Sequence, residues 1–131
     1  MTREKQGSRR WSFLMSIDQK VACHRAPKLP NDLPRAMEWR RDDHKGAPIH
    51  VYSDRGWRIS VMVESCAGDD ALQEAIAEEL AAAEDERDPV DFGVMVYVTL
   101  EPAGAPPDGV DLMMAILEML AKTCDGIVLP N

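Results

Sequence analysis

The sequence predicts an α+β fold, a two-layer sandwich in which two main helices lie on one face of a mixed or antiparallel sheet. Residues 49–63 alternate apolar and polar side chains around a turn, which is typical of a β-hairpin. Residues 92–100 are apolar on both faces, which is typical of a strand in the centre of a sheet. Residues 70–83 and 108–125 repeat apolar side chains at helical spacing instead.

Length and composition indicate one folded domain. Of the 131 residues, 45% are hydrophobic and 29% are charged, which is typical of globular proteins. A chain of this size buries roughly two thirds of the surface that it exposes when unfolded. Residues 1–10 are polar and have no apolar period, so we expect a flexible tail there and a single domain over residues 11–131.

The sequence predicts neither a membrane span nor a secretion signal. The longest apolar region, residues 110–121, is interrupted by two acids. The N-terminus is positively charged, but no sufficient apolar run follows it. We therefore expect a cytoplasmic protein that binds no membrane. The three cysteines, which have no C-x-x-C spacing, are expected to be buried free thiols: Cys23, Cys66 and Cys124.

The first strand is expected over residues 11–17, where every second side chain is apolar. Residues 18–48 contain three prolines before Pro48 and predict little regular structure. Within them, a short helix capped by Asp32 and a strand over residues 37–40 both fit. The charged residues 42–46 are expected to form a loop.

The hairpin turn ends at Gly56, because glycine readily adopts the positive φ that such turns require. The next helix is expected to begin with Asp70 as its N-cap and Gln73 in a capping box. Pro89 indicates that this helix ends before residue 89. The apolar stripe of the helix consists of Leu72, Ala75, Ile76, Leu80 and Ala83.

The last helix is expected to be capped by Asp108 and to stop at Gly126, a residue suited to a left-handed C-terminus. Its strongly polar side chains form one narrow stripe, Asp111, Glu118 and Lys122. We expect the sheet, and a second subunit in a possible homodimer, to cover the rest of its circumference.

A short strand over residues 127–129 ends the predicted order of elements. Strand–helix–strand connections between parallel strands are right-handed, so a ferredoxin-like arrangement is the specific topology expected.

Charge is distributed unevenly along the chain. Residues 1–50 hold eleven of the fifteen Lys and Arg and six of the twenty-three acids, which gives a charge of +5. The remaining 81 residues carry a charge of −13, so the net charge of the chain is −8. Between Asp69 and Asp91 lie ten acids and one cation, Arg87.

Helix stability does not explain all of these acids. Like-charged pairs four residues apart, such as Glu74 and Glu78, each cost roughly 0.2–0.5 kcal/mol. The acids at residues 84–86 follow a helix C-terminus, where the macrodipole favours cations. Electrostatic steering toward a basic protein would explain them. The residues predicted to bind this partner are Glu74, Glu78, Glu84, Asp85, Glu86, Asp88 and Asp91.

Other chemistries have weaker support in the sequence. Cys23 and His24 are adjacent, but no nearby acid or oxyanion site completes a nucleophile. The basic residues of the first half are mixed with acids and form no stripe, so we expect no nucleic-acid binding. We predict no catalytic residue, metal or cofactor. The alternative, a metal-dependent enzyme, would use Asp42, Asp43, His44 and His50.

The acidic residues 69–91 and the segment 120–130, a helix end, a glycine stop and a short strand before proline, resemble the small acidic immunity proteins of bacterial polymorphic toxin systems, including type VI secretion effectors. The resemblance implies a cytoplasmic protein that occludes the active site of a cognate toxin and performs no catalysis. The toxin would act in the cytoplasm, as a nuclease or nucleotide-modifying enzyme does. A homodimeric structural or regulatory domain is the first alternative.

Overall fold

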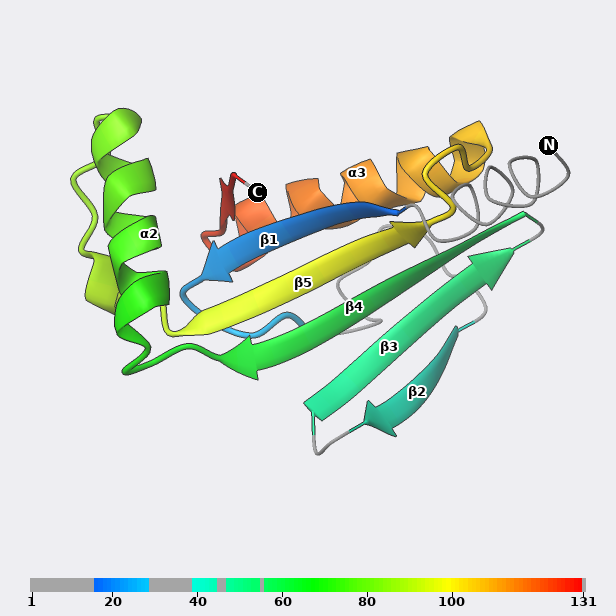
Figure 1. The fold of residues 1–131 in the computed structure, drawn as a ribbon, viewed down its shortest axis with the longest axis horizontal. Coiled ribbons are helices and arrows are strands. Elements are labelled where there is room, and N and C mark those ends of the chain that lie inside the picture. Colours follow the sequence, from blue (N-terminus) through cyan, green and yellow to red (C-terminus); the bar gives the residue numbers. More distant parts are fainter. Residues whose placement is uncertain (1–15, 29–38, 45–46, 55, 131) are drawn as a thin grey trace, which may run out of the picture.

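The computed structural model describes residues 16–28, 39–44, 47–54 and 56–130. Six antiparallel strands form one sheet in the order β2-β3-β4-β5-β1-β6, with two helices packed on it (Figure 1). The elements are β1 (Ile17–Cys23), β2 (Trp39–His44), β3 (Ala47–Asp54), β4 (Trp57–Ser65), α2 (Asp70–Ala82), the short 3₁₀ helix η1 (Pro89–Asp91), β5 (Val94–Glu101), α3 (Pro107–Thr123) and β6 (Ile127–Leu129). The predicted α+β class is confirmed.

Strand β5 lies between β4 and β1, so the predicted central strand is confirmed. Its alternate residues are buried on both faces: Met95 and Val96, which point to opposite sides, are each 0% exposed. The hairpin of β3 and β4 is also confirmed, and Gly56 in its turn has a φ of 85°.

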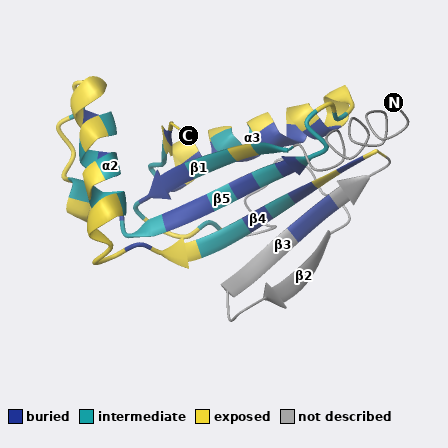
Figure 2. Cartoon of the chain, in the orientation of Figure 1, coloured by how far each residue is buried: buried dark blue, intermediate teal, exposed yellow. Residues whose placement is uncertain are grey.

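Helix α3 covers one face of the sheet, and together they form the larger core cluster. Figure 2 shows that β5 is largely buried, whereas β1 is buried toward its end and β4 toward its start. The strand residues of this core alternate along each strand, as expected for one face. They include Val21, Cys23, Ile59, Val61, Val96, Val98 and Leu100, which pack with Leu112, Met113, Ile116, Met119 and Leu120 of α3.

Helix α2 crosses one end of the sheet and belongs to a second core cluster (Figure 1). Its Ile76 and Leu80 pack with Ala22, Met95 and Phe92. The β1 and β5 residues in this cluster alternate with those that face α3, so α2 packs against the opposite face. The expected placement of both helices on one face therefore differs from the structure. An apolar helical stripe predicts burial but does not specify the sheet face.

The ferredoxin-like topology was wrong. Such a fold needs two crossover connections between parallel strands, but α2 connects β4 to its antiparallel neighbour β5. Of the two described helices, α3 alone connects parallel strands, since β5 and β6 both pair antiparallel with β1, which lies between them. Because α2 stands at the end of the sheet, the chain returns beside the strand that it left.

Two strand predictions need correction. Strand β1 extends to Cys23, through residues expected to be irregular; residues 11–15 of the predicted strand lie outside the described part. Val21, Ala22 and Cys23 are 0% exposed, because Val21 and Cys23 pack in the core cluster of α3 and Ala22 packs in the cluster of α2. Residues 42–44 belong to β2, not to a loop: they pair with β3, and charged residues are common on such edge strands.

The proposed helix and strand around residues 32–41 are only partly described. Trp39 and Arg40 lie in β2, in agreement with the strand alternative, and residues 29–38 lie outside the described part.

The predicted helix ends were also shifted. Asp69, not Asp70, is the N-cap of α2: its Oδ1 accepts from the Leu72 amide at 3.1 Å. Gln73 makes no capping box but donates its side-chain amide to Phe92 O at 3.2 Å. The N-cap of α3 is Pro106 instead of Asp108, because the helix begins with Pro107.

At the C-terminus of α3, Asp125 and not Gly126 has the positive φ, at 52°. Glycine is required at 126 for space instead, since a Cβ there would lie 2.7 Å from Val21 Cγ1. The short strand β6 that follows was predicted correctly.

The three cysteines are buried and form no disulfide in the described structure, in agreement with the prediction of buried thiols. None of the helices in the described residues has the length and apolarity needed to cross a membrane.

Candidate partner-binding surface

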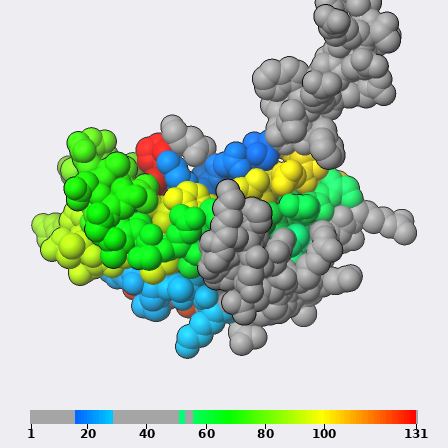
Figure 3. All heavy atoms as spheres, turned by 60° about the horizontal axis from the view of Figure 1, so that its bottom comes forward, coloured from blue at the N-terminus to red at the C-terminus, as the bar shows by residue number. Residues whose placement is uncertain are grey.

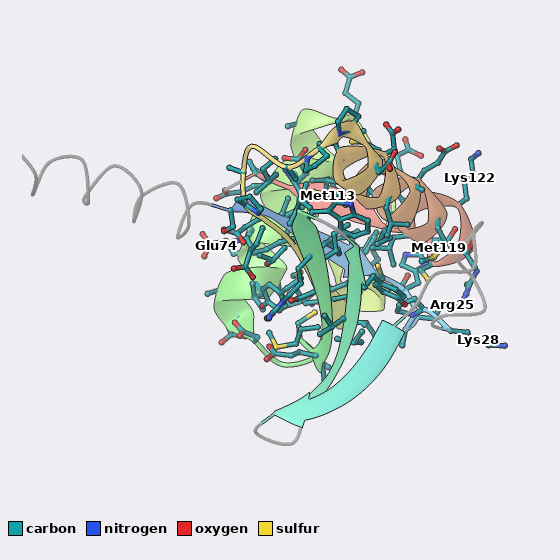
Figure 4. All side chains as sticks on the ribbon, turned by 90° about the vertical axis from the view of Figure 1, so that its right-hand side faces the viewer. Arg25, Lys28, Glu74, Met113, Met119 and Lys122 are labelled. Carbon is teal, nitrogen blue, oxygen red and sulfur yellow. The ribbon has the colours of Figure 1, made fainter. Side chains whose placement is uncertain are left out.

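Helix α2 and the acidic loop that follows it, residues 84–91, form one end of the molecule (Figures 1 and 3). Glu74 and Glu78 are exposed on α2, and Glu74 points away from the sheet in Figure 4. Ile76 and Leu80 anchor the opposite side of the helix in the second core cluster. The two predicted carboxylates are thus held outward on a helix whose other face is fixed.

The end of α2 places Glu84 in a strained conformation. The Glu84 amide donates to Ala81 O at 3.1 Å and the Asp85 amide donates to Leu80 O at 2.8 Å. These two bonds make a Schellman motif, in which the residue after the cap is left-handed and is commonly glycine. Glu84 has that role, with a φ of 54°. A left-handed residue with a side chain costs about 1–2 kcal/mol.

Asp85 and Arg87 make a side-chain clip that fixes the acidic loop. Asp85 accepts from the Arg87 backbone amide at 3.0 Å and from Arg87 Nη2 at 2.7 Å. The side-chain hydrogen bond from Arg87 lowers the pKa of Asp85 and raises that of Arg87. Asp85 therefore stays ionised, and its negative charge is paired with the positive charge of Arg87.

Arg87 also ties the acidic loop to the body of the protein. Its Nη1 donates to Asp125 O at 3.1 Å, just beyond α3. Its guanidinium lies 5.1 Å from the centre of the Phe92 ring, which is 0% exposed. A cation above an aromatic face adds a favourable contact. The guanidinium of Arg87 thus holds the acidic loop against Asp125 and against Phe92. The remaining acids of the loop therefore have defined positions.

A single turn of 3₁₀ helix ends the acidic loop and exposes an apolar side chain. Asp88 caps η1, since its Oδ1 accepts from the Val90 amide at 3.0 Å. Val90 is 71% exposed, the largest value among the exposed large hydrophobic residues described. The loop therefore combines the exposed acids Glu84, Glu86, Asp88 and Asp91 with an exposed valine.

The seven predicted residues thus have different local roles. Asp85 is engaged by Arg87 and Asp88 caps a turn, so local structure accounts for these two acids. No interaction of this kind holds the exposed side chains of the remaining predicted acids in the described structure. These are Glu74, Glu78, Glu84, Glu86 and Asp91. Sequence reasoning missed both Val90 and the clip; the Asp-x-Arg spacing was the available signal for the clip.

The Cys23–His24 pair has a different environment from that expected. The structure supplies an acid, since His24 Nδ1 lies 3.6 Å from Asp125 Oδ2, and the His24 ring meets Phe92 edge-on at 4.4 Å. Cys23, however, is 0% exposed, and burial, with Cys124, Cys66 and Asp125 nearby, raises its pKa to about 12. A protonated, inaccessible thiol is a poor nucleophile.

The alternative metal site falls on strands β2 and β3, where His50 pairs with Arg41 and Asp42 pairs with Ile49. The side chains concerned lie outside the described part, so this alternative stays a hypothesis. Among the described residues, no group of three His, Cys, Asp or Glu side chains is arranged to hold a metal ion.

Comparisons with protein families, with curated proteins and with solved structures found no match to this chain.

Proposed function

We propose that this protein is a protein-binding module that neutralises a cognate basic toxin, as an immunity protein does. The acidic end formed by α2 and the acidic loop would approach the toxin first and cover its active site. The proposal has no catalytic step and needs no cofactor.

Glu84 is the observation that carries this proposal. Its left-handed backbone would be more favourable with glycine, and its charge follows a helix C-terminus that favours cations. The Schellman motif needs this backbone conformation but not a glutamate, whose side chain is exposed and makes no capping or core contact in the described structure. Backbone strain at an exposed charged residue supports a functional role for that residue.

The surroundings of Glu84 support a docking surface. The clip between Asp85 and Arg87 orders the acidic loop, which lowers the entropy lost on binding. Exposed acids attract a basic protein and exclude acidic ones. Val90, exposed among them, supplies an apolar contact of the kind that slows dissociation once it is covered.

The test uses the product of the gene directly upstream, because toxin and immunity genes are expected to be neighbours. Co-expression with this protein should restore growth to cells that the upstream product arrests, and the two purified proteins should form a stable complex. A chain carrying Glu84→Lys and Glu86→Lys should protect less well. Asp108→Lys, a charge reversal on α3, is the control and should protect fully. A harmless upstream product, or equal protection by all variants, would contradict the proposal.

A further inference from the structure

Asp125 joins three parts of the chain that lie far apart in the sequence. It stands between α3 and β6. Its carboxylate contacts the end of β1, with Oδ2 at 3.4 Å from Arg25 Nη1 and at 3.6 Å from His24 Nδ1. Its carbonyl oxygen accepts from Arg87 Nη1 of the acidic loop at 3.1 Å. The C-terminal end of α3 is therefore in direct contact with the surface proposed to bind a partner.

The peptide group between Asp125 and Gly126 determines where this carbonyl points. The Gly126 amide donates to Leu120 O, in the last turn of α3, at 2.9 Å. In a trans peptide the N–H and the C=O point in opposite directions. Because the amide points at α3, the Asp125 carbonyl points away from α3, to the side on which the Arg87 guanidinium lies. The C-terminal stop of α3 thus aims a hydrogen-bond acceptor at the acidic loop.

Two constraints hold this peptide group in place. Asp125 is left-handed, with a φ of 52°, and this turns the chain back so that the Gly126 amide reaches Leu120. Gly126 is closely packed, since a Cβ there would lie 2.7 Å from Val21 Cγ1 and 3.2 Å from Cys23 Sγ. Val21 and Cys23 are fully buried. The acceptor for Arg87 is therefore fixed to the core of the protein.

The carboxylate of Asp125 contributes less than its backbone. The side chains of Arg25 and Asp125 are 59% and 46% exposed, and exposed ion pairs contribute little to stability. The hydrogen bond from Arg87 to the carbonyl has a charged donor, which makes it stronger than a bond between neutral groups. The backbone of Asp125, and not its charge, is thus the part that acts on the acidic loop.

We infer that the peptide group of Asp125 and Gly126 positions the acidic loop for its partner, so that Asp125 is a positioning residue of the docking surface. This role rests on the proposed function. Arg87 bonds Asp85 through Nη2 and Asp125 through Nη1. The acids on either side of Asp85 therefore take their positions from the end of α3. A loop that is held in this way loses less entropy when it binds.

Two substitutions at residue 125 separate the backbone from the charge. Asp125→Asn removes the charge, but asparagine adopts a left-handed backbone readily. Asp125→Val makes this backbone unfavourable, because valine is β-branched, so the peptide group should rotate and release Arg87. Rotation of the Arg87 guanidinium, measured by NMR in the protein alone, should be about tenfold faster in Asp125→Val and unchanged in Asp125→Asn. Unchanged rotation in Asp125→Val would overturn the inference.

Affinity for the upstream gene product shows whether this position matters for binding. Asp125→Val should raise the dissociation constant about tenfold, whereas Asp125→Asn should bind as the wild type does. Arg87→Lys leaves the backbone after α3 unchanged and is the second variant. Its ammonium can pair with Asp85 but lacks the fork that also reaches Asp125, so its affinity should fall by a similar factor. Circular dichroism checks that each variant is folded.

The two measurements distinguish the failure of this inference from that of the proposed function. If Asp125→Val releases Arg87 but binds with wild-type affinity, Asp125 does not position the docking surface and the proposed function stands. If the wild type does not bind the upstream product, the proposed function is wrong, and the role of Asp125 in binding is wrong with it, even where Arg87 is released as expected.

Discussion

Replacing Glu84 with glycine should make the fold more stable, although it removes a side chain. The left-handed backbone at Glu84 costs about 1–2 kcal/mol for a residue with a Cβ. Glycine avoids this cost but loses about 0.5–1 kcal/mol more conformational entropy on folding. Removing a negative charge near a helix C-terminus adds about 0.3 kcal/mol or more. The net expectation is a gain of about 1 kcal/mol, or about 4 °C in the melting temperature.

Urea denaturation monitored by circular dichroism measures this gain, with Glu86→Gly as the control. Glu86 carries the same exposed charge two residues away, but Glu84 and Asp125 are the non-glycine residues with positive φ in the described part. Glycine at 86 should therefore lower the free energy of unfolding by about 0.5–1 kcal/mol. If Glu84→Gly is no more stable than the wild type, the strain at this position is absent and the main support for a functional Glu84 is lost.

Three further results are expected. Val90→Ser should change the free energy of unfolding by less than about 0.5 kcal/mol but weaken partner binding about tenfold through faster dissociation; surface plasmon resonance separates the two rates, and an unchanged dissociation rate would exclude Val90 from the interface. Gly109→Ala should destabilise the fold by about 1–2 kcal/mol in urea denaturation, because a Cβ would lie 2.8 Å from Cγ of the buried Trp57; wild-type stability would mean that Trp57 can move aside. The pKa of Asp85 is lowered from 3.8 by Arg87, so the clip stabilises the fold above pH 3.8 and is lost as the pH falls through the lower folded-state pKa. Melting temperatures of the wild type and Asp85→Asn should thus differ at pH 6 and converge toward pH 2, and a constant difference would contradict this linkage.

The sequence predicts most elements because their patterns are local. The hairpin alternates at period two, and β5 is apolar on both faces at almost every residue. The sequence did not predict that β1 extends to Cys23. The buried part of this strand is only the three residues Val21, Ala22 and Cys23, and the polar Asp18, Gln19 and Lys20 precede them. Too few residues remained to show a period of two. Such a short strand is defined by its neighbours in the sheet, which one sequence does not supply.

The candidate surface was predicted as a charge excess and not as a structure. The run of acids is visible in the sequence, but backbone geometry decides which of these acids form hydrogen bonds or ion pairs. The clip of Asp85 and Arg87 forms where the chain leaves α2 through the left-handed Glu84. An Asp-x-Arg spacing is too common to predict this arrangement. The face of the sheet on which each helix packs was likewise beyond a local pattern.

Steering of a basic partner by the acidic loop is tested most directly by stopped-flow association rates with the upstream gene product. At low ionic strength, Glu84→Lys together with Glu86→Lys should lower the association rate constant about tenfold, and the difference should close as salt is added. A single reversal, Glu86→Lys, should slow association more than the control Asp108→Lys. Equal rate constants for the wild type and the double variant at low ionic strength would contradict the proposed role of these acids.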